Sequence, residues 1–172
     1  MNIKKIFIVF FLLSLNFPLK AEVPHYLDFK LILNESDAGK KAQNFLKKKL
    51  ESGIANIKKK EKSVQEDEKK IIAQKKIISA EEYKKKVSEL RNKVSQIQKE
   101  RGKLLENVAK QRAKARTEIL NNLNPIVKNY MNEKRIRMVM DKKNILLADE
   151  TLDITKDIMS LLNQKLKSIN LN

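Results

Sequence analysis

The sequence predicts an α+β fold that is mainly α, in which a long antiparallel coiled-coil helical hairpin is inserted into a small β-containing body. The 172 residues include only three Gly and three Pro, which leaves few sites for the tight turns of a many-stranded sheet. Apolar residues recur with heptad spacing along two long segments, and this spacing is typical of a coiled coil. Short apolar segments with strand-like patterns lie before and after these two segments.

The first 21 residues are typical of a secretory signal peptide. Lys4 and Lys5 precede an apolar stretch at residues 6–15, and Pro18 and Ala21 follow it. This is the order of the charged, apolar and cleavage regions of such a signal. The stretch is too short for a hydrocarbon layer of about 30 Å, which needs about 20 residues. We therefore expect cleavage after Ala21 and export of residues 22–172; an uncleaved membrane anchor is the alternative.

Residues 37–76 are predicted to form the first helical arm. Ser36 or Asp37 can cap its start, because their side-chain oxygens accept from unpaired amides. Positions along the expected contact seam alternate by four and three residues: Leu50, Ile54, Ile57, Glu61, Val64, Glu68 and Ile71. The seam is thus apolar except at two glutamates.

The second arm is predicted to begin at Ser79, because Ser79 and Glu82 have the spacing of a capping box. Its seam continues without a slip through Tyr83, Val87, Leu90, Val94, Ile97, Arg101, Leu104, Val108, Gln111 and Ala115. Only residues 77–78 separate the arms, so they should fold back on each other. Each arm should be roughly 60 Å long at 1.5 Å per residue.

Three residues within the predicted helices have low helix propensity. Pro125 lacks an amide donor, so we expect a kink there that separates the hairpin, residues 37–120, from the body. Gly53 and Gly102 lie inside the arms. Either glycine is a flexible point or a tolerated surface residue, and the sequence leaves both readings open.

Residues 22–36 and 121–172 are expected to form the body. Residues 26–29 are predicted to be a strand, and residues 136–140 and 145–148 a β-hairpin joined by 141–144. Thr155 or Asp153 should cap a last helix. The expected buried face of this helix consists of Ile158, Leu161, Leu162 and Leu166. The methionines expected in the core are Met138, Met140 and Met159. So small a body has a marginal core and open sheet edges, which favours self-association.

No pattern of catalytic or metal-ligating residues is present. The sequence has no Cys and a single His, His25, so thiolate catalysis, a histidine metal cluster and a Ser-His-Asp triad are excluded or improbable. The adjacent carboxylates Asp67 and Glu68 lie on a predicted solvated arm. We expect neither an enzyme nor a bound cofactor.

The positive charge is concentrated on the arms. Residues 37–120 contain 25 Lys and Arg against 12 Asp and Glu. Folding back gathers seven lysines at the hairpin tip: Lys69, Lys70, Lys75, Lys76, Lys84, Lys85 and Lys86. Nucleic acid, anionic lipid or lipopolysaccharide, and acidic protein segments are possible partners, and a merely solvated helix face is the fourth reading. Nucleic acid is the least favoured partner, because Tyr83 is the only stacking residue nearby and export separates the chain from DNA.

In this order, these segments resemble the Skp/OmpH family of periplasmic chaperones. Residues 26–29 and 32–42 are similar to the opening strand, turn and helix start of that family. Residues 138–148 and 152–155 are similar to its closing hairpin and last helix, and the turn at 79–82 and Pro125 lie where the family has its tip and helix irregularity. One position departs, because Arg135 stands where the family usually has Gly before the closing hairpin.

The resemblance implies a periplasmic homotrimer in which three bodies join their strands into a small barrel and three hairpins hang from it as tentacles around a cavity. The body residues to which trimerisation is assigned are Tyr26, Leu27, Phe29, Met138, Met140, Ile145 and Leu147. It also implies ATP-independent holding of unfolded outer membrane proteins in that cavity, which prevents their aggregation in transit. An envelope scaffold that binds anionic lipid or lipopolysaccharide through the basic tips is the alternative.

Overall fold

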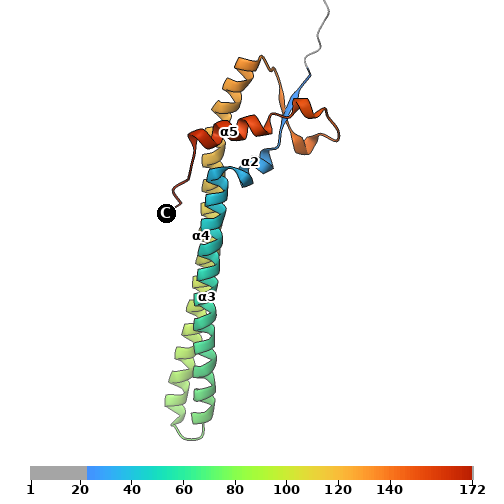
Figure 1. The fold of residues 1–172 in the computed structure, drawn as a ribbon. Coiled ribbons are helices and arrows are strands. Elements are labelled where there is room, and N and C mark those ends of the chain that lie inside the picture. The colour runs from blue at the N-terminus through green and yellow to red at the C-terminus, as the bar shows by residue number, and fades with distance from the viewer. Residues whose placement is uncertain (1–22, 172) are drawn as a thin grey trace, which may run out of the picture.

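The computed structural model describes residues 23–171, and the predicted signal peptide lies outside the described residues. The elements follow in the order β1 (His25–Leu27), α2 (Phe29–Glu35), α3 (Asp37–Gln74), α4 (Ala80–Lys134), β2 (Val139–Asp141), α5 (Thr155–Lys165). Two short 3₁₀ turns, Lys142–Asn144 and Glu150–Leu152, lie between β2 and α5. Figure 1 shows a small body from which the paired helices α3 and α4 project as a long arm. The predicted mainly α fold with an inserted hairpin is confirmed.

The hairpin forms as the heptad spacing predicts, with serine caps at both helix starts. The Ser36 hydroxyl accepts from the amide of Gly39, and the Ser79 hydroxyl accepts from the amide of Glu82. The turn between the helices spans residues 75–79, so it is slightly longer than expected. With 38 residues in α3, the arm is about 57 Å long at 1.5 Å per residue.

Helix α4 continues through Pro125 to Lys134, so the hairpin and body are not separated by a break in this helix. The reason is packing: Ile119, Leu123 and Ile126 are buried in the body core on the same face of α4. The core favours helical backbone on both sides of the proline despite the missing hydrogen bond. The second half of α4 therefore belongs to the arm and to the body at once.

Helix α4 ends at Arg135, whose backbone is left-handed with φ of 57°. The amide of Ile136 donates to the carbonyl of Met131 at 2.8 Å, which is the long hydrogen bond of a Schellman motif. Arg135 thus adopts the conformation for which glycine is favoured.

The body core forms between α2, α4 and α5. Ile32, Leu123, Ile158 and Leu162 have at most 1% of their surface exposed, and burying each such side chain contributes about 1.5–3 kcal/mol. Leu161, which was predicted to be buried, is 38% exposed, because α5 has a neighbour on one side only. Figure 1 shows α5 crossing α4 near the start of α3.

The two strands pair in parallel, with His25 opposite Val139 and Leu27 opposite Asp141. The predicted β-hairpin is wrong, because β2 ends at Asp141 and residues 142–144 form a 3₁₀ turn. The Asp141 carboxylate accepts from the amide of Lys143, and such a local bond turns the chain out of the strand. Residues 145–148 then have no strand partner among residues 23–171.

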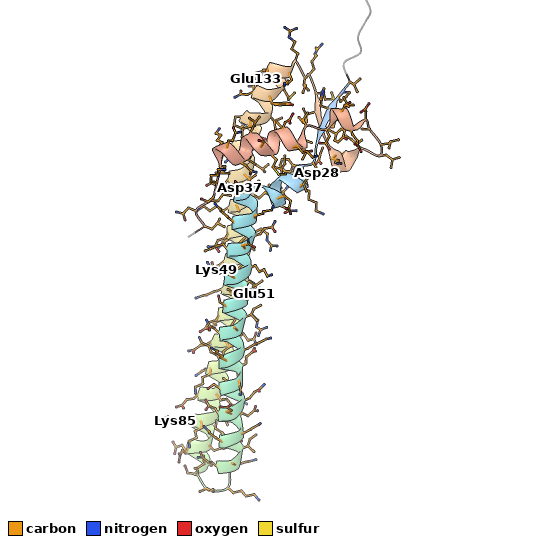
Figure 2. The ribbon with its side chains drawn as sticks, viewed as in Figure 1. Asp28, Asp37, Lys49, Glu51, Lys85 and Glu133 are labelled. Carbon is orange, nitrogen blue, oxygen red and sulfur yellow. The ribbon has the colours of Figure 1, made fainter. Side chains whose placement is uncertain are left out.

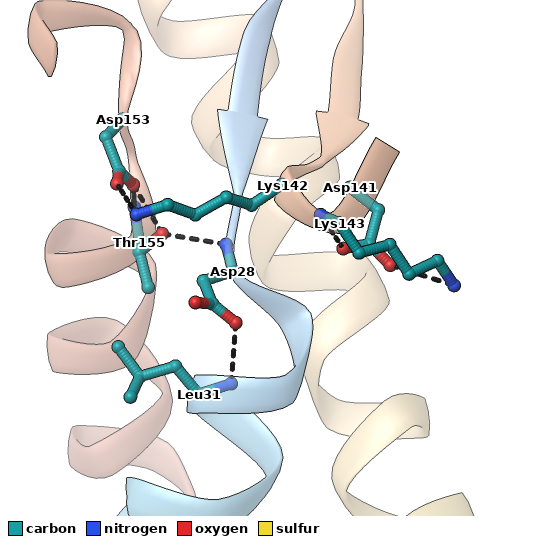
Figure 3. A network of polar contacts seen from close by, with 7 residues as sticks. All are labelled: Asp28, Leu31, Asp141, Lys142, Lys143, Asp153 and Thr155. Carbon is teal, nitrogen blue, oxygen red and sulfur yellow. Dashed lines mark hydrogen bonds and ion pairs between the residues drawn. The ribbon is translucent and has the colours of Figure 1, made fainter. Parts of the chain in front are cut away.

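The first strand is also shorter than predicted, since Asp28 caps a short helix. Its carboxylate accepts from the amide of Leu31 at 2.8 Å, and its own amide donates to the hydroxyl of Thr155. Phe29 therefore begins α2 instead of ending a strand. Figure 3 shows this network, in which Asp153 also contacts Thr155 and Lys142.

Candidate functional site

The arm is the most extended charged surface of the molecule, and ion pairs hold its two helices together. Three pairs join α3 to α4 at nitrogen–oxygen distances of 2.6–2.7 Å: Lys60–Glu100, Glu61–Arg101 and Asp67–Lys93. The hydrogen bond from Lys93 and its charge hold the pKa of Asp67 below the usual value. Carboxylates between the helices are therefore neutralised, and the excess of cations faces solvent.

The predicted seam residues are buried to different degrees, because a pair of helices covers each seam from one side only. Ile57, Ile97 and Val108 are buried. Half-buried members are Leu50, Val64, Ile71, Val87, Leu90 and Leu104. Ile54 and Val94 remain 40% and 42% exposed, so the arm presents apolar side chains among its charges.

The two arm glycines have different surroundings. A Cβ atom on Gly53 would lie 2.5 Å from a methyl carbon of Leu104, whereas one on Gly102 would meet nothing within 4 Å. Gly53 therefore provides space for Leu104 to pack against α3. Gly102 has no such packing role.

An open groove, which we call the arm-base groove, lies where the arm meets the body. Its volume is about 780 Å³. Its apolar lining includes Leu46, Val108 and Ala115, and its polar lining includes Lys47, Arg112 and Arg116 but no carboxylate. Such a lining suits a partner that is apolar and carries negative charge.

Comparison with known proteins decides the family. The family model of outer membrane protein (OmpH-like) matches residues 25–162, which is most of the chain. The chain belongs to the OmpH-like family. None of the curated protein sequences matches it. Among solved structures, the chain is similar to one from Caulobacter crescentus CB15 that is described as an OmpH-like outer membrane chaperone, with TM-score 0.77 and 19% identity over 86% of this chain and 89% of that chain.

In this OmpH-like chain the predicted tip lysines lie together around the turn at 75–79. All are exposed except the half-buried Lys86, which pairs with Glu82 at 3.2 Å. Lys75 lies over the ring of Tyr83, 5.8 Å from its centroid. Figure 2 shows Lys85 at the end of the arm that is remote from Asp28 and Glu133 of the body.

The sequence reading missed the apolar residues of the tip. Ile72 and Ile77 are 60% and 83% exposed and lie among the lysines. Residues 77–78 were assigned only to the connection between the arms. Ile77 lies in the turn between the two helices, where neither helix covers it, and its position in the connection was the available signal.

The body residues to which trimerisation was assigned fall into three groups by exposure. Tyr26 and Leu27 are buried within the single chain, at 5% and 6% exposure. Phe29 and Ile145 are half-buried. Met138, Met140 and Leu147 are exposed at 56%, 38% and 92%, as is the neighbouring Leu146 at 103%. The methionines are therefore not core residues of the single chain, because β2 has β1 on one side and no strand on the other within residues 23–171.

Within residues 23–171 no group of three or more His, Cys, Asp or Glu is placed to hold a metal ion. His25 lies in β1, where its backbone amide donates to the carbonyl of Met138. Over the same residues, no helix combines the length and apolar character that a bilayer span requires.

Proposed function

We propose that this chain is a periplasmic, ATP-independent chaperone that holds unfolded outer membrane proteins and prevents their aggregation in transit. The observation that carries the proposal is the long arm, on which a net positive charge and exposed apolar side chains occur together. Membership of the OmpH-like family and the fold shared with an OmpH-like outer membrane chaperone support it.

The charge and the apolar residues of the arm have separate tasks in this proposal. Cations in solvent attract acidic segments of a client over about 8–10 Å, the screening length at physiological salt. Exposed side chains such as Ile54 and Val94 then contact apolar client residues weakly. Many weak contacts hold a client by multivalency and allow release without nucleotide hydrolysis.

We further propose that three bodies associate, with the arms around a common cavity. The free edge of β2 and the exposed Met138, Leu146 and Leu147 support association, because open strand edges and exposed apolar patches are usually covered by a partner. Sedimentation of the purified mature chain tests it, and a stable monomer would contradict it.

The chaperone proposal is tested by diluting a urea-unfolded outer membrane barrel protein into buffer with and without this protein. We expect light scattering from aggregation to be suppressed without ATP. Aggregation that proceeds unchanged over a range of chaperone concentrations would overturn the proposal.

An envelope scaffold that binds anionic lipid is the second candidate, favoured by the exposed Ile72 and Ile77 among the tip lysines. Basic residues around an apolar tip suit a headgroup and acyl-chain boundary. Co-sedimentation with phosphatidylglycerol vesicles should then be lost when the seven tip lysines are changed to Ser. It should be kept in a control with seven exposed lysines elsewhere on the arms changed: Lys41, Lys48, Lys58, Lys59, Lys62, Lys99 and Lys103.

A further inference from the structure

The segment of residues 166–171 leaves α5 and lies in extended form along the base of the arm. Figure 1 shows it running from the end of α5 toward the C label, beside α3 and α4. Leu171 is 4% exposed and packs with Ala42, Leu46, Val108 and Ala115. Ile169 packs against this cluster and against the body core, and Lys167 pairs with Asp37 at 3.1 Å. The segment lies beyond residues 25–162, the part that the family model matches.

Ile169 and Leu171 are two residues apart in the sequence, and both pack with the arm cluster. In an extended chain, side chains at this spacing point to the same side. Alternation of apolar and polar residues is the pattern of a strand, and it is also the pattern of outer membrane barrel strands. The segment therefore binds the arm in the manner of a short unfolded peptide. The segment packs on Leu46, Val108 and Ala115, which also line the arm-base groove, although no residue of the segment lines that groove.

The side-chain amide of Gln111 is only partly satisfied in this arrangement. Its Nε2 donates to the backbone carbonyl of Leu171, while its Oε1 is buried without a hydrogen-bond partner. An unpaired buried acceptor costs about 1–3 kcal/mol. A peptide that offers both a carbonyl and an amide to this side chain would satisfy the two groups together.

We propose that the arm surface formed by Ala42, Leu46, Val108, Gln111 and Ala115 is a binding site for an extended client segment with apolar side chains at alternate positions. Residues 166–171 occupy it in the empty protein and leave it when such a segment binds. This inference rests on the proposed chaperone function and names the client feature that is recognised. The protein's own segment competes with clients, since it lowers the fraction of protein that is free to bind.

The test compares the full chain with a chain that ends at Lys165. Fluorescence anisotropy is measured with a labelled octapeptide that alternates Leu and Asn, and with an isomer in which the Leu residues are contiguous. We expect the shortened chain to bind the alternating peptide about tenfold more tightly than the full chain does, and to prefer it over the isomer. Changing Gln111→Met in the shortened chain should weaken binding about fivefold. Equal affinities of the full and shortened chains, or of the two peptides, would overturn the proposal.

A second measurement applies if the shortened chain loses helix content. The sequence has no Cys, so Leu171→Cys introduces a single thiol at the buried position and Ser168→Cys introduces one at an exposed position. The thiol at 171 should react slowly with a disulfide reagent and reach the rate of the one at 168 when the alternating peptide is added. A rate that the peptide leaves unchanged contradicts the proposal. Light scattering on the same proteins tests the chaperone function separately, and the peptide and thiol results decide the site whatever the scattering shows.

Discussion

The carboxylate of Glu61 on α3 lies 2.6 Å from the guanidinium of Arg101 on α4, and both residues occupy seam positions that are otherwise mostly apolar. A polar pair at one level of a coiled coil fixes the register of the helices. Their side chains are 36% and 46% exposed, so the bond contributes little free energy and mainly specifies alignment.

Replacing both residues by Leu should therefore stabilise the arm but weaken its register. We expect the thermal midpoint of Glu61→Leu/Arg101→Leu to rise, because apolar residues replace a polar pair at the seam. Coupling between Glu61→Ala and Arg101→Ala should be at most about 1 kcal/mol in a double-mutant cycle. Unfolding followed by circular dichroism measures both the thermal midpoint and the coupling energy. A coupling energy of several kcal/mol would contradict the small contribution assigned to the ion pair.

The arm glycines provide a matched pair of substitutions. Gly102→Ala should stabilise the protein by about 1 kcal/mol, because it only raises helix propensity. Gly53→Ala should stabilise the protein less than Gly102→Ala does, or destabilise it, because the new Cβ atom would displace the side chain of Leu104. The thermal midpoints of the two variants are compared with that of the unchanged protein. Equal stabilisation by the two alanines would show that Leu104 repacks without cost.

Arg135→Gly should stabilise the end of α4. The left-handed backbone at this position costs an ordinary residue about 1–2 kcal/mol, which glycine avoids, although glycine loses more entropy on folding. The expected net gain is up to about 1 kcal/mol in urea unfolding. Arg91→Gly is the control, since Arg91 is exposed within α4 and the change should destabilise by about 1 kcal/mol.

Asp153 should make the body sensitive to acid. Burial raises the pKa of this carboxyl, but the hydrogen bonds from Thr155 and Lys142 outweigh burial and hold the pKa below its usual value. A lowered folded-state pKa contributes stability that is present above the unfolded-state pKa of about 3.9 and is lost as pH falls through the folded-state value.

Asp153→Asn should thus be less stable than the unchanged protein at pH 7, by about 1 kcal/mol, and the difference should shrink at pH 2–3. Urea unfolding at both pH values measures it. Glu150→Gln is the control, because Glu150 is exposed in the preceding 3₁₀ turn. A difference that is the same at both pH values would contradict the role of the charge.

Leu146→Asp/Leu147→Asp should block self-association of the body without unfolding it. The two side chains are 103% and 92% exposed in the single chain, so the charges meet no neighbour there. Sedimentation should show a smaller species with unchanged helix content. The control is Leu105→Asp, at a position on the arm that is 52% exposed, and it should leave the size of the assembly unaltered. Equal sizes for the unchanged protein, the double variant and this control would exclude Leu146 and Leu147 from the interface.

The arms could be predicted from the sequence because heptad spacing and serine caps are local signals. Glu61 and Arg101 were assigned to the seams, but their pairing was not predicted, because Glu68 and Gln111 are polar seam residues as well. Body pairing is not local: alternation at 136–140 indicates a strand but does not say which partner it takes. β2 pairs with β1, more than a hundred residues earlier, and not with residues 145–148.

Two further features depend on tertiary context. Pro125 lies within α4 and does not end the helix, because residues on one face of α4 are buried on both sides of it. The site of residues 166–171 could not be located either, since Ile169 and Leu171 form no periodic pattern long enough to assign. Gln111 was the available signal, as a polar residue in an apolar seam column.

The insertion of the hairpin between β1 and β2 sets an order for folding. A helical hairpin closes within microseconds because its contacts are near in sequence. The parallel strands β1 and β2 can pair only after α3 and α4 have folded back on each other and brought the two ends of the arm together. We expect the sheet to be the last part to form, so that a folding chain presents its basic arm to the surroundings before its body is complete.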